Sequence, residues 1–194
     1  MSREQEAGKI LGKAFEQYPL MQYAFEGKSA QVKQQGLLNL YTHCTYAASK
    51  YGGLLLREDR KGALIWLPGK AFPLGLWREI QSGMAAIPFK LGPKTTLRLM
   101  NHDAVPEGWI AKNAGPHMGY IWVVGVSAAE RGNGYSRELI EQSITDMKAQ
   151  GLTEYWLKTE DPKNVGIYQK LGFEVVNEVV VKSSGIRSWM MKRV

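Results

Sequence analysis

The residues best suited to chemistry lie in one glycine-punctuated segment near the middle of the chain. Residues 124–136 read Val-Gly-Val-Ser-Ala-Ala-Glu-Arg-Gly-Asn-Gly-Tyr-Ser, and an amphipathic helix is predicted directly after Gly134. The first N–H groups of a helix lack internal acceptors and carry partial positive charge, and glycines let phosphate oxygens approach the backbone. The segment therefore predicts an anion-binding loop that needs no Lys or Arg at the contact.

The loop differs from two better-known phosphate-binding patterns. The Walker pattern requires Gly-Lys followed by Ser or Thr, and the Rossmann pattern requires G-x-G-x-x-G. Gly132 and Gly134 provide G-x-G, but Arg137 stands at the position of the third glycine. Taken alone, the loop fits equally well a helix start that uses two glycines for a tight turn.

Two motifs in order resemble those of the GNAT acetyltransferases. Residues 131–136 are similar to motif A, in which a valine-rich strand precedes Arg or Gln and then x-x-Gly-x-Gly or Ala. Residues 164–173, Asn-Val-Gly-Ile-Tyr-Gln-Lys-Leu-Gly-Phe, resemble motif B. The resemblance covers residues 117–194. It is closest to the puromycin-acetyltransferase-like members, because of His117 before the strand and Ile-Arg-Ser-Trp-Met-Met at residues 186–191.

This resemblance implies an acetyl-CoA-dependent N-acetyltransferase that moves an acetyl group directly to a primary amine of a small molecule or peptide. The N–H of Val124 would stabilise the oxyanion, and Tyr168 would protonate the departing thiolate unless it is simply packed under a short helix. Asn164 would contact the coenzyme or cap that helix. The residues expected to bind acetyl-CoA are Val124, Gly125, Val126, Arg131, Gly132, Asn133, Gly134, Tyr135, Ser136, Asn164 and Tyr168.

The general base is where the chain departs from the resemblance. Puromycin-acetyltransferase-like proteins usually carry Leu-Glu-Thr on the strand after motif A, whereas this chain has Lys158 in the middle position. Glu160 lies two residues further on, so strand alternation predicts that it faces the same side and could act as the base. His117 is the other candidate, although a structural histidine is favoured there. Holding amine and thioester together accounts for as much as ~7–11 kcal/mol without a base.

The composition argues against several other classes of protein. The chain has a net charge of +7, but its Lys and Arg residues are scattered without the interleaved aromatic residues of a nucleic-acid-binding surface. Its one cysteine, Cys44, is predicted to lie in an N-terminal helix away from both motifs, and no Cys or His cluster predicts a metal site. We expect no disulfide, no membrane span, a cytoplasmic setting, and a monomer or homodimer. A catalytically weak acyl-CoA-binding or regulatory module stays open as the alternative function.

The elements that must position these residues alternate along the chain. Strand, helix, strand, helix and strand after residue 117 predict a sheet covered by helices. The resemblance implies an α/β (α+β) fold whose mixed, mostly antiparallel sheet has six to seven strands and helices on both faces. We expect one domain, residues 1–194, in which residues 1–116 form the acceptor side and first hairpin and residues 117–194 the acetyl-CoA-binding core.

Hydrophobic periodicity and turn residues place the individual elements. Residues 76–87 are expected to form one helix before a break at Gly92-Pro93, and a second helix is expected to begin near Thr95. Period-two alternation predicts that Phe173, Val175, Asn177, Val179 and Val181 share one face of a strand. The other expected helices are residues 4–17, 29–50, 135–150 and 162–171, and the expected strands are residues 54–56, 63–67, 120–124, 154–159, 173–181 and 187–192.

Overall fold

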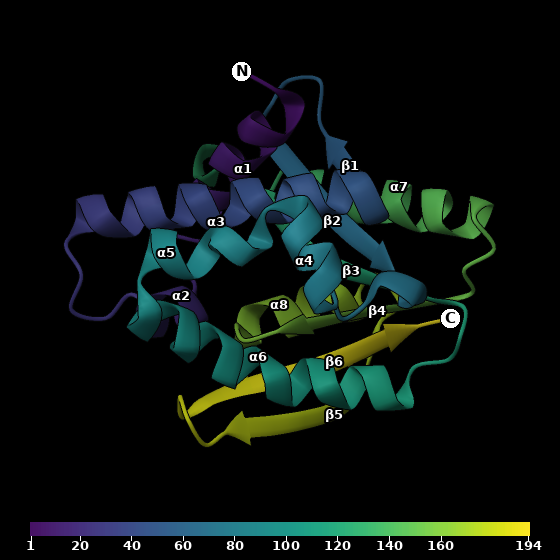
Figure 1. The fold of residues 1–194 in the computed structure, drawn as a ribbon. Helices are drawn as coiled ribbons and strands as arrows, with labels where there is room; N and C mark the ends of the chain where they lie inside the picture. Colours follow the sequence, from purple (N-terminus) through teal and green to yellow (C-terminus); the bar gives the residue numbers. More distant parts are fainter.

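The computed structural model describes residues 1–194, and a six-stranded sheet runs through its centre in the order β1-β2-β3-β4-β6-β5 (Figure 1). Only β3 and β4 pair in parallel, and the other neighbours pair antiparallel. The expected mixed, mostly antiparallel sheet is confirmed. Its strands are β1 (Gly53–Leu56), β2 (Gly62–Pro68), β3 (Met118–Val126), β4 (Glu154–Thr159), β5 (Glu174–Val181) and β6 (Ile186–Arg193).

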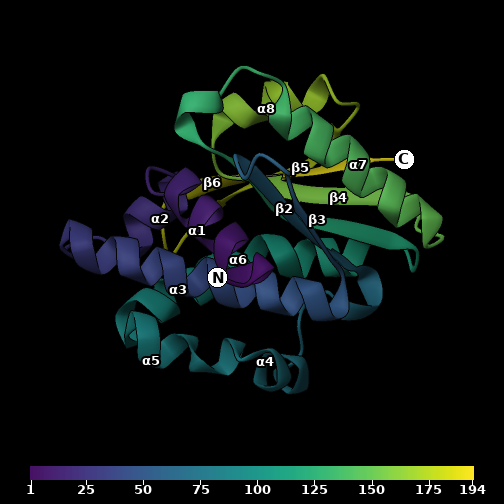
Figure 2. The same cartoon turned by 90° about the horizontal axis from the view of Figure 1, so that it is seen from above.

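Helices cover both faces of the sheet, as expected. Figure 2 shows α7 and α8 on one face, and α1, α3 and α6 on the other. None of the helices combines the length and the apolar character needed to span a membrane. The α-helices are α1 (Arg3–Ala14), α2 (Pro19–Ala24), α3 (Ala30–Tyr51), α4 (Leu76–Ser82), α5 (Ile87–Leu91), α6 (Pro93–Asn113), α7 (Tyr135–Ala149) and α8 (Pro162–Gln169), and short 3-10 turns are formed by Gly69–Ala71, Met84–Ala86 and Ala128–Glu130.

The helix starts follow from local side-chain chemistry. Ser2 and Gln5 form a reciprocal capping box at the start of α1, and Ser29 caps α3. Asp161 caps α8 by accepting a hydrogen bond from a backbone N–H of the first turn. Helix α7 differs, because it begins after Gly134 with no side-chain cap. Its first amides are therefore left without a capping group.

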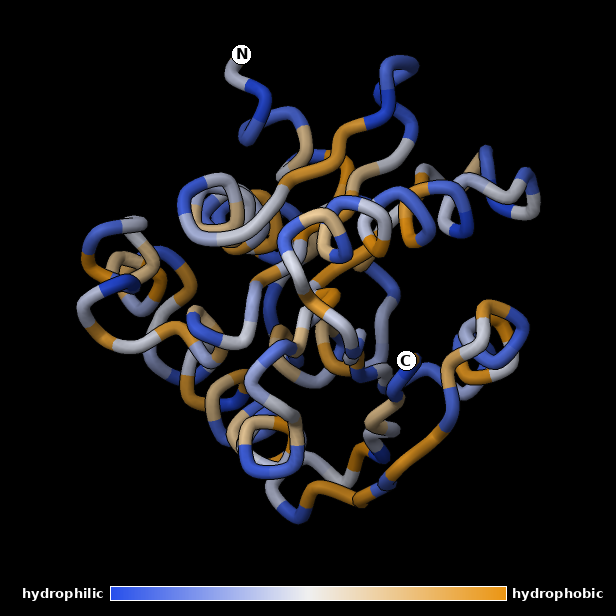
Figure 3. The backbone as a smooth tube through the Cα atoms, turned by 90° about the vertical axis from the view of Figure 1, so that its right-hand side faces the viewer, coloured by the Kyte–Doolittle hydropathy of each residue, from blue (hydrophilic) through white to orange (hydrophobic).

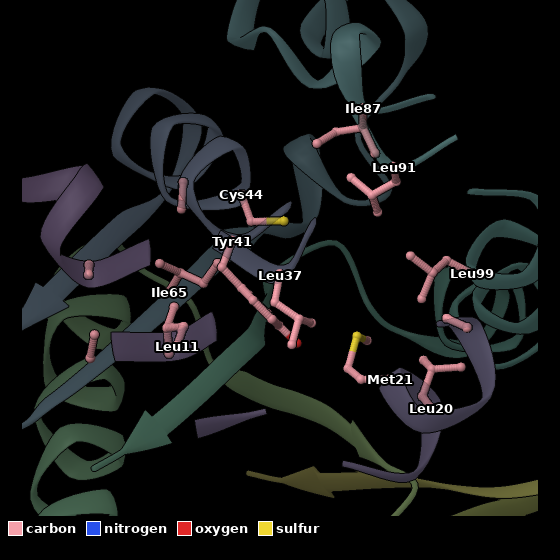
Figure 4. Close-up of a cluster of buried hydrophobic side chains, with 14 of the residues drawn as sticks. Leu11, Leu20, Met21, Leu37, Tyr41, Cys44, Ile65, Ile87, Leu91 and Leu99 are labelled. Carbon is pink, nitrogen blue, oxygen red and sulfur yellow. The ribbon is translucent and has the colours of Figure 1, made fainter. Parts of the chain in front are cut away.

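Apolar clusters on both faces fix the helices to the sheet. Figure 4 shows the largest cluster, to which Leu11 comes from α1, Met21 from α2 and Leu37 from α3. On the other face, Ile140 and Met147 of α7 are fully buried against the sheet. Burying such a side chain contributes roughly 1.5–3 kcal/mol. Figure 3 shows the resulting pattern, with apolar segments along the interior strands and hydrophilic segments at the peripheral turns.

The segment between β2 and β3 departs from its expected helices. The helical spacing over residues 76–87 is interrupted at Gly83, whose φ of 78° is left-handed and ends α4. Helix α6 begins at Pro93 rather than near Thr95. Helix α2 was not expected, because its six residues are too few to establish an apolar period.

The predicted single face of β5 is wrong beyond Val175. Val175 pairs with Met191 and Asn177 pairs with Met190, so a bulge places Val176 as an extra residue in the strand. Met190 and Met191 are consecutive residues of β6 and point to opposite faces, and therefore Val175 and Asn177 do as well. A bulge depends on the partner strand, which period-two alternation does not include.

Candidate active site

A split between two parallel strands opens the middle of the sheet. The pairing of β3 with β4 ends at Tyr120 and Trp156, although β3 continues to Val126. Beyond that point the edge of β3 that faces β4 has no strand partner. The split begins directly after Tyr120, which marks its closed end.

The hydrogen bonds of β3 to its other neighbour show which groups face this split. The Ser127 N–H donates to the carbonyl of Lys61 at 2.8 Å, on the side of β2. In an antiparallel pair, alternate residues direct their N–H and C=O groups toward the partner strand. The regular register from Val123 to Val126 therefore turns the backbone groups of Val124 and Val126 away from β2, into the split.

The loop that follows β3 presents a row of unpartnered amides. Gly132 and Gly134 have φ values of 90° and 79°, a left-handed conformation that glycine adopts without steric cost. At both positions a Cβ would meet no atom within 4 Å, so the loop borders open space. No protein acceptor bonds the backbone N–H groups of Gly132, Gly134, Tyr135, Ser136 and Arg137. These amides form a cradle for an anion at the start of α7.

Side chains around this cradle are largely engaged with each other. Lys61 pairs with Glu130 at 2.8 Å, and the guanidinium of Arg57 lies 3.7 Å from the centre of the Tyr135 ring. The side-chain amide of Asn133 donates to Glu130 at 3.0 Å. Asn133 is the one expected coenzyme-binding residue that does not line the cavity described next.

A cavity of about 880 Å³ joins the cradle to the split and to α6. Most of its lining residues are apolar, which is typical of a small-molecule site with a few placed polar groups. The expected site residues that line this cavity are Val124, Gly125, Val126, Arg131, Gly132, Gly134, Tyr135, Ser136, Glu160, Asn164 and Tyr168.

Gly125 has a packing role in addition to its place in β3. A Cβ there would lie 2.9 Å from both the Ala14 Cβ and the Leu11 Cδ2 of α1. The absent side chain lets α1 lie directly on β3. This glycine therefore sets the position of α1 against the sheet.

Comparison with known proteins agrees with this architecture. Residues 91–173 match the model of the acetyltransferase (GNAT) family. An uncharacterised N-acetyltransferase of Schizosaccharomyces pombe is 28% identical over 173 residues, covering 86% of this chain and 69% of that protein. The residues that match the family model include the cradle, both sides of the strand split and Tyr168.

Two solved structures share this fold over nearly the whole chain. A mosquito arylalkylamine N-acetyltransferase-like 5b structure has a TM-score of 0.61 at 13% identity, covering 98% of this chain and 94% of that chain. A crystal structure of an acetyltransferase has a TM-score of 0.51 at 17% identity, covering 97% and 95%. The match to a chain of the NatC complex bound to Gag peptide and CoA covers only 39% of this chain and 50% of that chain, with a TM-score of 0.37 and 23% identity.

At its other end, the cavity holds a cluster of charged side chains. The Lys158 ammonium lies 2.8 Å from Asp103 and 3.0 Å from Glu160. Burial alone would lower the pKa of Lys158, but the two carboxylates outweigh it and raise the pKa above its ordinary value. Lys158 therefore stays charged and joins α6 to β4.

Glu160 is the most heavily coordinated member of this cluster. One carboxylate oxygen lies 3.0 Å from both the Ser188 hydroxyl and the Lys158 ammonium, and the other accepts from Tyr18 at 2.9 Å. Burial would raise the pKa of Glu160, but Lys158 and the nearby His102 lower it well below the ordinary range. A carboxylate stabilised in this way is a weak proton acceptor.

His102, Asp103 and Glu160 also form a group whose potential metal ligands all lie within 4.8 Å of one another. The His102 Nε2 atom is 3.4 Å from the nearer Glu160 oxygen. The Lys158 ammonium contacts both carboxylates of this group and already supplies a positive charge there. The donor set therefore has a cation of the protein's own, and we assign no metal to it.

Glu107 lies one helical turn after Asp103 and contrasts with Glu160. Its side chain forms no ion pair, and its hydrogen bond is to the Tyr120 hydroxyl at 3.4 Å. Burial and the negative charge of Asp103 raise the pKa of Glu107 to about 8. Tyr120 marks the closed end of the strand split, so its hydrogen bond to Glu107 places Glu107 beside that end.

Tyr168 reaches the cavity from α8, on the face opposite α6. No protein atom hydrogen-bonds to its hydroxyl, and its ring packs edge-on against Phe173 with centroids 6.2 Å apart. Burial and the charges of Glu160 and Asp161 raise the pKa of Tyr168. The hydroxyl therefore stays protonated near neutral pH, and complete proton transfer from it is more uphill than an unperturbed tyrosine would suggest.

Three other sequence expectations change with the structure. Asn164 does not cap α8, because Asp161 does so; the Asn164 amide instead donates to the Thr159 hydroxyl at 3.3 Å. His117 is exposed and lies outside the cavity, so it is not a candidate base. Cys44 was expected to lie away from the motifs but lines the cavity, where burial and neighbouring carboxylates raise the pKa of its thiol.

Sequence reasoning missed the contribution of α6. Asp103 and Glu107 are separated by four residues, a spacing that places two side chains on the same side of a helix. An acidic pair at this spacing in a helix that also buries Leu99 and Ile110 was the available signal. The sequence does not show which strand this acidic pair would face.

Proposed function

We propose that the protein is an acetyl-CoA-dependent N-acetyltransferase that moves an acetyl group to a primary amine of a small molecule or peptide. The observation that carries this proposal is the row of free amides at the start of α7, next to a split strand edge. The amides suit the diphosphate of the coenzyme. The exposed edge of β3 at Val124 and Val126 suits its amide-containing pantetheine arm.

Transfer would then take place within a ternary complex. The Val124 N–H, which faces the split, is our candidate donor to the oxyanion formed when the amine attacks the thioester carbonyl. The free hydroxyl of Tyr168 would assist the departing thiolate. Because burial disfavours the tyrosinate, we assign Tyr168 a strong hydrogen bond to the developing charge, followed by proton donation.

A transfer through an acetylated cysteine is the competing route, because Cys44 lines the cavity. Cysteine attacks as the thiolate, and the raised pKa of Cys44 leaves almost none of it ionised at neutral pH. No basic side chain hydrogen-bonds to its sulfur. Direct transfer to the amine is therefore the route we assign.

The expected base, Glu160, receives a different role in this proposal. Its low pKa and its contacts with Lys158, Tyr18 and Ser188 suit an anchor that holds β4 against α2 and β6. Within the family, we place the protein nearest the puromycin-acetyltransferase-like members on the residues quoted from its sequence. Lys158, in place of their glutamate, joins this anchor.

Coenzyme binding is tested by the thermal midpoint of unfolding with and without acetyl-CoA. If Kd is about 10 μM, about 1 mM ligand stabilises the fold by ~2.7 kcal/mol, which corresponds to a rise of roughly 5–10 °C. Adenosine, which lacks the diphosphate, is the control and should shift the midpoint far less. No shift with acetyl-CoA at that concentration would contradict the proposal.

Transfer is tested by thiol release from acetyl-CoA with a panel of primary amines. The panel should include arylalkylamines, amino acids and short peptides with free N-termini. Acetyl-CoA-dependent thiol release with at least one amine is the expected result. Tight coenzyme binding without turnover on any amine would instead identify a coenzyme-binding module.

A further inference from the structure

The acceptor end of the cavity carries more carboxyl groups than cationic groups. Asp103, Glu107 and Glu160 are carboxyl groups at this end, whereas Lys158 is the cation that contacts them. The Lys158 ammonium is already shared by Asp103 and Glu160. Glu107, which is half-buried, therefore has no positive partner from the protein.

The walls around this acidic end are apolar and aromatic. They differ from the cradle end, where free amides and Arg131 face the cavity. An apolar wall excludes water and strengthens the attraction between a carboxylate and a positive charge. The large side chains that form the wall are Phe15, Tyr41, Met84, Leu99 and Trp122.

The carboxyl group of Glu107 lies beside the strand split. Its carboxyl group accepts from Tyr120, and the strand split begins directly after Tyr120. Glu107 also lines the same cavity as Val124 and Tyr168, the residues to which we assign the transfer step. An acceptor amine that reaches the thioester through this cavity can therefore contact Glu107.

Building on the proposed function, we propose that the acceptor is a small amine that enters as an ammonium ion on an apolar body with no carboxylate beside it. Glu107 is the specificity-determining residue that receives the ammonium. It also takes up one ammonium proton, directly or through one water. An amino acid would bring its own carboxylate toward Asp103 and Glu107 and be repelled.

The acid strengths favour Glu107 over Glu160 for this step. An alkylammonium ion has a pKa near ~10, so a carboxyl of pKa about 8 accepts its proton about two units uphill. Glu160, whose pKa is lowered, would be a far poorer acceptor. The groups that face Glu107 are Asp103 on α6, Lys158 and Glu160 at β4, Tyr120 on β3, and Cys44 on α3.

The protons and bonds balance in this scheme. Glu107 takes one proton from the ammonium, and the free amine attacks the thioester carbonyl, so a C–N bond forms and the C–S bond breaks. The thiolate receives a proton from Tyr168, which regains one from the second proton lost by the amine nitrogen. The products are the amide, the coenzyme thiol and one proton released to solvent from Glu107.

The substrate class is tested by calorimetric titration of the CoA-loaded protein with 2-phenylethylamine, 2-phenylethanol and phenylalanine. The titration is carried out at about pH 9, where Glu107 is mostly ionised and the amine is mostly protonated. The alcohol has the same apolar body without the charge, and phenylalanine adds a carboxylate. We expect the amine to bind at least ~10-fold more tightly than either. Equal binding of the amine and the alcohol would overturn the inference and leave the proposed function intact.

The residue is tested at the same pH with Glu107→Gln, which keeps the shape and removes the charge that Glu107 carries there. The variant should bind 2-phenylethylamine at least ~10-fold more weakly and keep the wild-type Kd for acetyl-CoA. The matched control is Glu174→Gln on β5, because Glu174 is exposed and lies outside the cavity. An unchanged amine affinity in a Glu107→Gln variant that binds acetyl-CoA normally would overturn the role of Glu107.

The pH dependence of kcat/KM distinguishes proton uptake by Glu107 from a purely structural role of this residue. In the wild type, kcat/KM for 2-phenylethylamine should rise with pH through an ionisation near pH 8, where Glu107 loses its proton. Glu107→Gln should lack this ionisation. If the variant fails to fold, the wild-type titration still decides the substrate class. If the wild type does not bind acetyl-CoA, the proposed function is wrong, and this inference fails with it.

Discussion

The two ends of the cavity differ in composition, because one is formed by backbone groups and the other by side chains. The end at α7 consists of backbone amides without acceptors. Glycines form the loop there, and no side chain caps α7 at Gly134. The end at α6 is made of side chains, with Lys158 of β4 held between Asp103 and Glu160. A backbone site depends on local conformation, whereas a side-chain site depends on which elements are packed together.

This difference gives the two ends different sensitivities to substitution. Removing one side chain from the acidic end should disturb both charge balance and stability. At the cradle, only a change in backbone geometry should matter, because the amides themselves remain. Substitutions of Lys158, Tyr168, Gly134 and Cys44 test this difference, and their expected effects decrease in that order.

Replacing Lys158 by Met should have the largest effect on stability. Removing one partner of a buried ion pair costs up to about 3–5 kcal/mol, and we expect about 3 because Asp103 is one-third exposed. The midpoint of thermal unfolding should fall by roughly 6–12 °C. Lys148→Met, on the exposed face of α7, is the control and should change the midpoint little. A Lys158 variant as stable as this control would show that the cluster does not join α6 to β4.

Replacing Tyr168 by Phe should reduce kcat by about 100-fold, at the low end for general acid catalysis. We expect the low end because the raised pKa of Tyr168 limits complete proton transfer. The KM for acetyl-CoA should change little. Steady-state kinetics with the best amine of the panel measures both constants. Tyr46→Phe, at an exposed site outside the cavity, is the control, and equal rates for the two variants would exclude Tyr168 from the transfer step.

Gly134→Ala should weaken acetyl-CoA binding by about 10-fold. The residue has a φ of 79°, where a side chain costs roughly 1–2 kcal/mol and turns the amides out of position. Gly151→Ala is a matched control, because Gly151 has the same φ and equally open surroundings beyond the other end of α7. Both variants should lose similar stability, but only Gly134→Ala should lose affinity in calorimetric titration. Equal loss of affinity in both would mean that the cradle is not the coenzyme site.

Cys44→Ala should have the smallest effect, a change in kcat of less than about 3-fold. The thiol is buried and its pKa is raised, so it does not act as a nucleophile in direct transfer. Initial-rate patterns with varied acetyl-CoA and amine should intersect, as a ternary complex requires. Parallel lines together with an inactive Cys44→Ala variant would establish the acetyl-cysteine route instead.

The same contrast explains what could be predicted from the sequence. The cradle was predictable because Gly132, Gly134 and the following helix are adjacent in the chain, and local residue types determine its geometry. The alternation of strands and helices along the chain followed from periodicity, and the helices on both faces of the sheet followed from the resemblance. The bulge at Val176 did not, because it arises from pairing with β6.

The acidic end was not predictable for a related reason. Asp103 and Lys158 are 55 residues apart, and only the packing of α6 against β4 brings them together. Cys44 was expected to be remote from the motifs, yet α3 crosses the sheet and places it in the cavity. Glu160 lines the cavity, but its weakness as a base follows from neighbours that the sequence does not reveal.

The most direct test of the central claim is residue-resolved amide hydrogen exchange with and without acetyl-CoA. The structure leaves the amides of Gly132, Gly134, Tyr135 and Ser136 without acceptors, so they should exchange rapidly in the free protein. Saturating acetyl-CoA should slow the exchange of these amides and of those of Val124 and Val126. Unchanged exchange at residues 132–136, with protection appearing elsewhere, would contradict the account.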